Sequence, residues 1–319
     1  MTDLPRTTRV RVPPIKTQGI KTKIVPLIMS SIKWDGVGKW IEPFVGSGAV
    51  VFNVQPKNAL LSDTNKHIIS LYAGIQSGNI TPRLVKEHLE YEGHKLLTQG
   101  EDHYYLLRDR FNSKSNPLDF LFLNRSCFNG MIRFNRKGGF NVPFCRKPNR
   151  FRQAYITKIC NQVAWVKDIL ADKNWVFKVA DWRESVSEAN CNDFIYLDPP
   201  YIGRHTDYFN HWRQSDADSL ASTLQTTQSG FAYSMWLENK YRKNDHLDRW
   251  FSDYPMFTIT HFYHVGPTES LRNAMQEALI VSHNHAVDKT YGASLLRDFK
   301  IIDDDEEDEQ ISLPLYYVE

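Results

Sequence analysis

The sequence predicts an α/β fold, in which a mainly parallel sheet is interrupted by an inserted, mainly helical segment that carries a β-hairpin. Three observations carry this prediction. A short strand runs into a glycine turn and an apolar helix near residue 45, and a second strand, Phe194–Leu197, stops at two prolines. Between them, residues 66–153 lose the strand pattern and resemble consecutive helices followed by a glycine-containing reversal. The length of 319 residues suits one large domain or one domain with an insertion.

Composition excludes several classes of protein. We find no apolar stretch that could span a bilayer, and residues 1–14 contain arginines without the apolar core of a signal peptide. The four cysteines form no C-x-x-C pair, so we expect reduced thiols in a cytoplasmic protein and neither a disulfide frame nor a zinc site. The pairs His261/His264 and His283/His285 lie in strand-like segments, where a structural role is favoured. The sequence therefore predicts no membrane segment and no metal.

The first half of the chain contains the elements of an adenosine pocket. A basic entry at residues 15–23 precedes a predicted helix, Ile24–Ile32. Strand, glycine turn and helix follow over residues 39–54, and a second strand ends at Asp63, where an acidic side chain suits ribose hydroxyls. The candidate cofactor residues of this part are Glu42, Phe44, Gly46, Gly48 and Asp63. The third glycine of the dinucleotide fingerprint is missing, so this pattern alone does not separate NAD from S-adenosylmethionine.

Residues 66–153 combine predicted helices with a strongly basic end. Helices are predicted over residues 68–75, 81–97 and 102–111, with another starting at 117–123, and Lys137–Gly139 is the predicted tip of a hairpin. No Asp or Glu occurs from Phe120 to Lys167. Arginine and asparagine can read guanine and adenine edges while cations contact phosphates. We therefore predict DNA contacts from Asn124, Arg125, Asn129, Arg133, Asn135, Arg136, Lys137 and Asn141.

The second half is expected to complete the sheet. A helix over 153–170 and a strand over 175–180 lead to Asp181, a further candidate cofactor contact. Residues 203–212 are a candidate lid, 216–227 a helix, and 231–236, 257–265 and 277–282 strands. Residues 303–309 are almost wholly acidic, which predicts a solvated tail. The predicted division is 1–65 and 154–302 for the sheet domain, 66–153 for the insert and 303–319 for the tail.

The turn Asp198-Pro199-Pro200-Tyr201 is the strongest candidate for chemistry. Two prolines stiffen it at the carboxyl end of a strand, where open α/β sheets bind their ligands. The Asp198 carboxylate and the Pro199 carbonyl can accept two amine hydrogens, and Tyr201 can stack on a flat ring. The sequence thus favours a substrate with an exocyclic amine on an aromatic ring, with these three residues as the catalytic set.

Taken together, several motifs resemble a known family. They are E-P-F-V-G-S-G at 42–48, S-D at 62–63, F-N-G-M-I-R-F-N at 128–135, F-N-V-P-F at 140–144 and D-P-P-Y at 198–201. In this order they resemble the Dam family (D12 class, α-group) of DNA adenine-N6 methyltransferases, from about Pro14 to His283. The resemblance implies a Rossmann-like sheet with a DNA-recognition insert, S-adenosylmethionine as cofactor and double-stranded DNA as substrate, without a metal. Residues 13–23, 123–135 and 201–209 are most similar to enzymes that modify GATATC within restriction-modification systems.

The resemblance also implies individual roles. Lys21 and Thr17 would contact S-adenosylmethionine, although Thr17 replaces the aromatic residue that is usual in Dam itself. Lys16 would approach the first guanine of the site and Arg133 a later base pair. Phe128 would stand beside the vacated stack with Asn129 near the orphaned base, and Met131 and Pro143 would contribute apolar contacts. A cognate endonuclease would act on the same site without a stable complex, in the cytoplasm at the bacterial nucleoid.

Other functions remain open on the residues alone. An N4-cytosine methyltransferase would usually have Ser in place of Asp198, and none of the cysteines follows a proline as C5-cytosine chemistry requires. An RNA or protein-glutamine methyltransferase would more often have N-P-P-Y. A dehydrogenase would leave D-P-P-Y and the basic insert unexplained, and a DNA-binding regulator without activity would not need an intact turn. A Dam-like enzyme acting on GATC is the nearest alternative to GATATC.

Overall fold

The computed structural model describes residues 9–17, 19, 21–201, 212–239, 242–262, 274–288 and 300–302. Its main sheet has the strand order β4-β3-β2-β5-β6-β9-β8, with β7 pairing on β6. The strands are β2 (Trp40–Glu42), β3 (Asn58–Asp63), β4 (Asn174–Val179), β5 (Phe194–Leu197), β6 (Gly230–Asn239), β7 (Arg242–Lys243), β8 (Met256–Phe262) and β9 (Ala274–Val281). A separate parallel pair joins β1 (Arg9–Arg11) to β10 (Lys300–Ile302).

The direction of the strands fixes where a ligand can bind. β4, β3, β2, β5 and β6 are parallel neighbours, whereas β9 runs antiparallel to both β6 and β8. The chain continues from β2 to β3 on one side, and β5 pairs with β2 on the other side. Open α/β sheets bind ligands at such a switch point, beyond the carboxyl ends of the strands. The turns after β2 and β5 therefore meet at the expected position.

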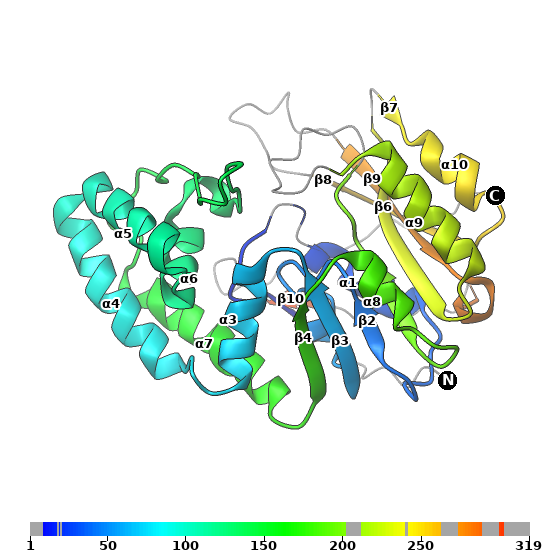
Figure 1. Cartoon of the computed structure of the whole chain (residues 1–319), viewed down its shortest axis with the longest axis horizontal. Helices are drawn as coiled ribbons and strands as arrows, with labels where there is room; N and C mark the ends of the chain where they lie inside the picture. The colour runs from blue at the N-terminus through cyan, green and yellow to red at the C-terminus, as the bar shows by residue number, and fades with distance from the viewer. Residues whose placement is uncertain are drawn as a thin grey trace.

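Two apolar layers enclose the sheet because successive strand residues point to opposite faces. Trp40 stacks on Phe194 with ring centroids 5.4 Å apart in one layer, while Ile41 and Ile195 belong to the other. The first layer is covered by α1 (Val25–Ser31), α2 (Val51–Val54), α3 (Lys66–Gln76) and α7 (Gln153–Leu170). The second is covered by α8 (Trp182–Ser187), α9 (Gln214–Thr226) and α10 (Asp245–Phe251) (Figure 1).

The insert between β3 and β4 is mainly helical. It contains α4 (Pro82–Gln99), α5 (Glu101–Lys114), α6 (Pro117–Ser126) and the 3-10 turn η2 (Phe128–Gly130). These helices lie beside the sheet, and α7 leads back along α4 to β4 (Figure 1). Thr81 caps α4 and Asn116 caps α6 by accepting from backbone N–H groups, and each cap precedes a proline in the first turn.

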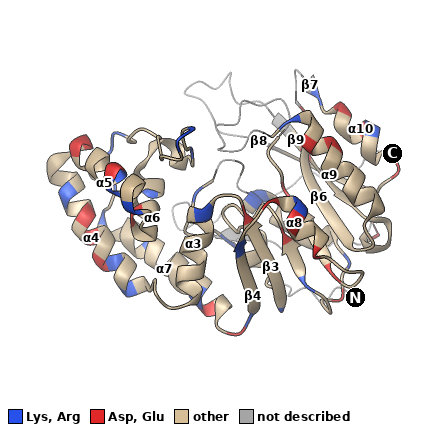
Figure 2. Cartoon of the chain, viewed as in Figure 1, with Lys and Arg blue, Asp and Glu red and all other residues tan. Residues whose placement is uncertain are grey.

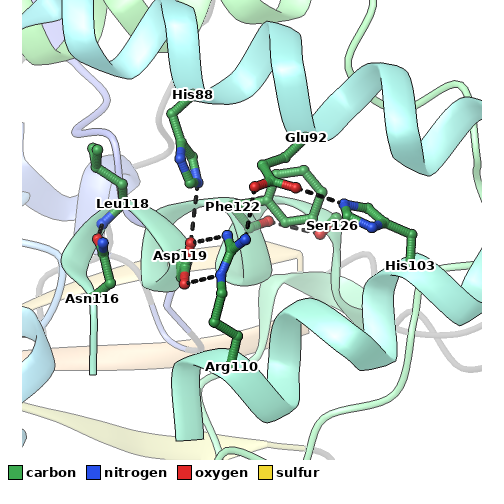
Figure 3. A network of polar contacts seen from close by, with 9 residues as sticks. All are labelled: His88, Glu92, His103, Arg110, Asn116, Leu118, Asp119, Phe122 and Ser126. Carbon is green, nitrogen blue, oxygen red and sulfur yellow. Dashed lines mark hydrogen bonds and ion pairs between the residues drawn. The ribbon is translucent and has the colours of Figure 1, made fainter. Parts of the chain in front are cut away.

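A buried ion network joins the three helices of the insert (Figure 3). Arg110 of α5 donates from Nη2 and Nε to the two oxygens of Asp119 on α6, at 2.5 and 2.8 Å. Its Nη1 donates to Glu92 Oε1 of α4 at 2.9 Å. His103 Nε2 lies 2.8 Å from Glu92 Oε2, and His88 Nε2 lies 3.3 Å from Asp119 Oδ1. Because both carboxylates are almost fully buried, Arg110 is the cation that makes their burial tolerable.

The expected hairpin at the end of the insert forms a reversal with little strand. Asn135 N–H donates to Gly139 O at 2.8 Å, and Gly138 has the positive φ, +79°, of a tight turn. Only isolated bridges, Phe134↔Phe140 and Cys127↔Phe144, flank this turn. The prediction of two short strands is therefore wrong, because the proline at 143 and the glycines leave too few ladder bonds.

Most other predicted elements occur with shifted ends. The predicted helix 24–32 is confirmed as α1, and a 3-10 turn, η1 (Lys21–Ile24), leads into it. Helices α8 and α10 were not predicted. Of the predicted lid, only Trp212 is described, and the acidic tail, the end of strand 257–265 and the side chain of His261 lie outside the described residues. Within the described part, no helix combines the length and the apolar character that a membrane span requires.

Candidate active site and DNA-recognition loop

Four acidic residues follow four neighbouring parallel strands at one edge of the sheet. Glu42 ends β2, Asp63 ends β3, Asp181 comes just after β4, and Asp198 follows β5 directly. The predicted cofactor residues at strand ends and the D-P-P-Y turn are thus brought to one edge.

The glycine turn after β2 is tied to the end of β3. Gly46 N–H donates to Asp63 Oδ2 at 3.0 Å, and Asn65 N–H donates to Asp63 Oδ1 at 2.8 Å. Gly46 and Gly48 have φ values of +48° and +73°, and a Cβ on Gly48 would lie 2.5 Å from the Phe52 ring. Burial raises the pKa of Asp63 to about 6, against the lowering effect of the two N–H bonds. Asp63 therefore shapes the turn and presents carboxylate oxygens beside it.

Glu42 is a buried carboxyl behind the glycine turn. Trp40 Nε1 donates to its Oε2 at 3.0 Å, and burial raises its pKa to about 8. Phe44 lies in the same turn, half-buried, with its ring edge-on to Trp212 at 5.5 Å between centroids. An aromatic pair and buried carboxyls around a bent backbone fit a ligand with a flat ring, hydroxyls and a positive charge.

The remaining cofactor predictions have different surroundings. Asp181 is the N-cap of α8, accepting from Arg183 N–H at 2.9 Å, and it is half exposed in an ion pair with Arg183. Thr17 is half-buried in the segment before η1. Lys21, in η1, contacts the D-P-P-Y turn.

The D-P-P-Y turn holds a charged cluster that is nearly closed to solvent. Lys21 Nζ lies 2.9 Å from Asp198 Oδ1 and donates to the Tyr201 hydroxyl at 2.7 Å. The side chains of Lys21 and Asp198 are 5% and 20% exposed, so the carboxylate is the member that a substrate can reach. Burial raises the pKa of Asp198 to about 6, Lys21 lowers it, and Glu277 raises it. At neutral pH Asp198 remains an acceptor for amine hydrogens.

Glu277 of β9 is a member of this cluster that sequence reasoning missed. Its Oε1 accepts from the Tyr201 hydroxyl at 2.7 Å and lies 4.0 Å from Lys21 Nζ. It is 1% exposed. The signal available in the sequence was a single acidic residue within a mostly apolar strand, and this signal does not identify its partners.

The loop after α6 exposes the residues expected to enter the duplex. Phe128 is 51% exposed, which is unusual for a large aromatic side chain. Asn129 beside it is exposed and has a left-handed backbone, φ +53°. Phe128 N–H donates to the carbonyl oxygen of Pro143. Pro143 itself is exposed, and Met131 is half-buried. The tip of this loop therefore presents an apolar ring and an amide to solvent.

Asn124 and Arg125 do not face solvent, which corrects their prediction as DNA contacts. Asn124 is fully buried and clamps the backbone of Lys16, accepting from its N–H and donating to its C=O, both at 2.8 Å. Arg125 is 1% exposed and donates to Pro14 O and to Gln162 Oε1. Side chains buried in this way cannot reach a base edge. They fasten the N-terminal segment to the insert.

Two further asparagines of the loop also have structural bonds. Asn135 Oδ1 accepts from the N–H groups of Lys137 and Gly139 at 2.9 and 3.0 Å, which closes the turn. Asn141 accepts from Arg133 Nε through its side chain at 2.8 Å and from Nη2 through its carbonyl at 2.9 Å. Asn141 thus sets the orientation of the Arg133 guanidinium.

Lys16 joins this loop although it lies far away in sequence. A Cβ on Gly130 would come within 2.7 Å of Lys16 Cβ, so the lysine stem crosses the loop at its glycine. Arg136, Lys137, Arg146 and Lys147 are exposed. Figure 2 shows Lys and Arg at the end of the insert that reaches towards the sheet. Among the described residues, no three His, Cys, Asp or Glu side chains are grouped to hold a metal ion.

Comparison with known proteins agrees with this arrangement. The model of the D12 class N6 adenine-specific DNA methyltransferases matches residues 18–265. A DNA adenine methylase of Serratia marcescens is 33% identical over 200 residues, which cover 58% of this chain and 68% of that protein. The Type II methyltransferase M.MjaIII of Methanocaldococcus jannaschii is 32% identical over 59% of this chain and 68% of its own.

A third relative covers more of both chains. The Type II methyltransferase M.CviBI of Paramecium bursaria Chlorella virus NC1A is 32% identical over 228 residues, 68% of this chain and 80% of that protein. The matched region contains the glycine turn, the insert and the D-P-P-Y turn. The chain belongs to the family of D12 class N6 adenine-specific DNA methyltransferases.

Proposed function

We propose that this adenine-N6 DNA methyltransferase acts at a specific duplex site, GATATC, within a restriction-modification system, on an adenine rotated out of the helix. The observation that carries the chemical part is the Asp198 carboxylate. It is the accessible acceptor of an otherwise buried cluster, and it lies on the turn after β5 at the switch point of the sheet. An amine buried in a base pair cannot reach this turn without base flipping.

The catalytic turn acts by orienting the amine. Asp198 and the Pro199 carbonyl accept its two hydrogens, and Tyr201 stacks on the adenine ring. Holding both N–H groups on one side favours a pyramidal nitrogen whose lone pair faces away from the turn. S-adenosylmethionine supplies the electrophilic methyl group when bound. The rate enhancement then comes mainly from positioning and fixed charges, and Asp198 is not required to remove a proton before the attack.

The cofactor would be held by the elements around the glycine turn. Asp63, already shaped by two backbone N–H groups, suits the ribose hydroxyls, and Phe44 suits the adenine ring. The Asp198 carboxylate provides the negative charge that a sulfonium favours, and the buried carboxyl of Glu42 provides a polar group behind it. Lys21 links this pocket to the catalytic turn.

The loop after α6 would read the site and replace the flipped base. Phe128 and Asn129 are exposed at its tip, where an aromatic wedge and an amide could fill the vacated stack. Arg133 is fixed by Asn141, a geometry that suits reading one base pair. Arg136 and Lys137 would contact phosphates.

The choice of GATATC rests on the resemblance of residues 13–23 and 123–135, and GATC is the alternative. The test is transfer of labelled methyl from S-adenosylmethionine to duplexes containing GATATC, GATC or a scrambled site. Labelled N6-methyladenine in the GATATC duplex alone is the expected result. Labelling of every GATC duplex would show that the recognition site is GATC, as in the Dam enzymes. Labelled cytosine would refute the assignment of adenine N6 as the methylated amine.

A further inference from the structure

We propose that Glu277 is a positioning residue for methyl transfer, which fixes the stacking ring of Tyr201 and shares Lys21 with Asp198. This inference rests on the proposed flipping of adenine onto Tyr201. The four groups come from η1, the turn after β5 and β9, so the fold assembles them from three distant parts of the chain.

The direction of the hydrogen bonds follows from the donors available. A lysine ammonium can only donate, so the Tyr201 hydroxyl accepts from Lys21 Nζ at 2.7 Å. The single phenolic proton is then directed to Glu277 Oε1, also at 2.7 Å. Glu277 is thereby the last acceptor in the series of hydrogen bonds that runs from Lys21 through Tyr201. Two opposed bonds at one oxygen hold the phenol in place, and with it the plane of the ring.

Glu277 also affects Asp198, because both carboxylates lie near the Lys21 ammonium. One ammonium lies 2.9 Å from Asp198 Oδ1 and 4.0 Å from Glu277 Oε1, in surroundings that are almost closed to water. Glu277 draws Lys21 partly away from Asp198, which leaves Asp198 a better acceptor for an amine. Without Glu277, Lys21 would lose this second carboxylate, and the Tyr201 hydroxyl would lose the carboxylate that accepts at 2.7 Å.

Two consequences distinguish positioning from a role in folding. Removing the Glu277 acceptor should slow the transfer step by about 10- to 100-fold, because a stacking ring displaced by an ångström misplaces the amine. Removing its charge should shift the acid limb of the rate to lower pH, because Glu277 raises the pKa of Asp198. The other groups that face Asp198 are Lys21, Glu42, Tyr196 and Tyr233.

The tyrosines and Glu42 do not titrate together with Asp198. Burial raises the pKa of both tyrosines, so they remain neutral. Glu42, with a pKa of about 8, is mostly protonated through the range in which Asp198 titrates. Asp63 also has a pKa of about 6, so the acid limb between about pH 5 and 7 contains both carboxyls, and the part that moves when the charge of Glu277 is removed reports Asp198.

The experiment measures single-turnover methyl transfer against pH, at saturating S-adenosylmethionine and duplex, for the wild type, Glu277→Ala, Glu277→Gln, Tyr201→Phe and the double variant Tyr201→Phe/Glu277→Ala. Fluorescence of 2-aminopurine at the target position reports flipping, and thermal melting reports folding. Glu238→Ala removes an exposed carboxylate of the neighbouring strand β6 and is the matched control.

We expect Glu277→Ala to be slow and Glu277→Gln to recover most of the lost rate, because the amide oxygen still accepts the phenolic proton. The double variant should be no slower than the slower single variant, and the acid limb should move to lower pH in Glu277→Gln. A wild-type rate in Glu277→Ala, additive losses in the double variant, or an unmoved acid limb would each overturn the proposal. If Glu277→Ala does not fold, the acid limb of Glu277→Gln decides. A wild type that neither flips nor methylates the target would instead contradict the proposed function.

Discussion

The turn after β5 and the loop after α6 both contain the polar residues expected to act on DNA, but the structure uses them differently. In the turn, Asp198 and Tyr201 are themselves the predicted reactive groups, and buried partners bond to them. On the recognition side, Asn124 near the end of α6 and Asn135 in the loop are predicted to contact bases, but both hold the backbone instead. A rigid site can use its motif residues directly. A loop that projects from the fold needs part of its polar residues to maintain its own shape.

The largest effect should come from breaking the turn. Asp198→Ala removes the accessible carboxylate, so methyl transfer should fall by about 10²- to 10³-fold or more, while affinity for a duplex with purine in place of the target adenine is retained. Transfer of labelled methyl and a gel-shift titration measure the two properties. Asp253→Ala, an exposed carboxylate before β8, is the control and should behave as wild type. Equal losses in both variants would show that the assay reports something other than the turn.

The ion network that joins α4, α5 and α6 can be tested separately by measuring the free energy of unfolding. Arg110→Met leaves the buried carboxylates of Glu92 and Asp119 without their cation, which should cost about 3 kcal/mol. Arg83→Met removes an exposed partner of Glu87, and because water screens this pair the free energy of unfolding should stay nearly the same. Urea unfolding measures both. An Arg110 variant as stable as the Arg83 variant would mean that the network of Figure 3 does not hold the insert together.

Substitutions of loop residues that contact bases should change sequence discrimination, whereas substitutions of residues that contact phosphates should change overall affinity. Arg133→Ala should cost about 1–3 kcal/mol of discrimination at one base pair, and Asn141→Ala should lose part of the same discrimination by releasing the guanidinium. Lys137→Ala should weaken binding evenly across sequences and reduce its salt dependence. Relative methylation of all single-base variants of the site measures these effects. An unchanged preference in Arg133→Ala would remove it from the set of readers.

The smallest effect concerns pH. The pKa of Asp198 is raised to about 6, and its ionised form accepts the amine. Methyl transfer should therefore be constant well above this value, fall to half near pH 6, and decline about tenfold per unit below it. A pH profile at saturating substrates measures this limb. A limb near the ordinary pKa of an exposed carboxyl would mean that Asp198 is not buried in the reacting complex.

The sequence predicted the sheet and the catalytic turn because their signals are local. Phe194–Leu197 followed by two prolines, and Ala59–Leu61 before Asp63, specify strands that end at polar residues without reference to the rest of the chain. The partners of these residues are not local. Nothing near Glu277 in sequence indicates that it accepts from Tyr201, since the contact depends on the insertion of β9 beside β6.

For the recognition loop, composition predicts the charge of the surface but not which side chains are buried. Its composition predicted a basic surface, and Arg136 and Lys137 are exposed. Composition could not predict which polar residues point inward, because burial of Arg125 depends on Gln162 and on the segment that ends at Pro14. The packing of the loop is likewise not local in sequence, since Phe134 stacks on His67 of α3.

The most direct test asks whether Asp198 binds the amine of the target base. Competition binding compares duplexes with adenine or purine at the target position, the second lacking only the exocyclic amine, for the wild type and Asp198→Ala. The difference between the two proteins cancels the cost of flipping each base. We predict a coupling of about 1.5–3 kcal/mol between the carboxylate and the amine. The same adenine-to-purine ratio in both proteins would contradict the account.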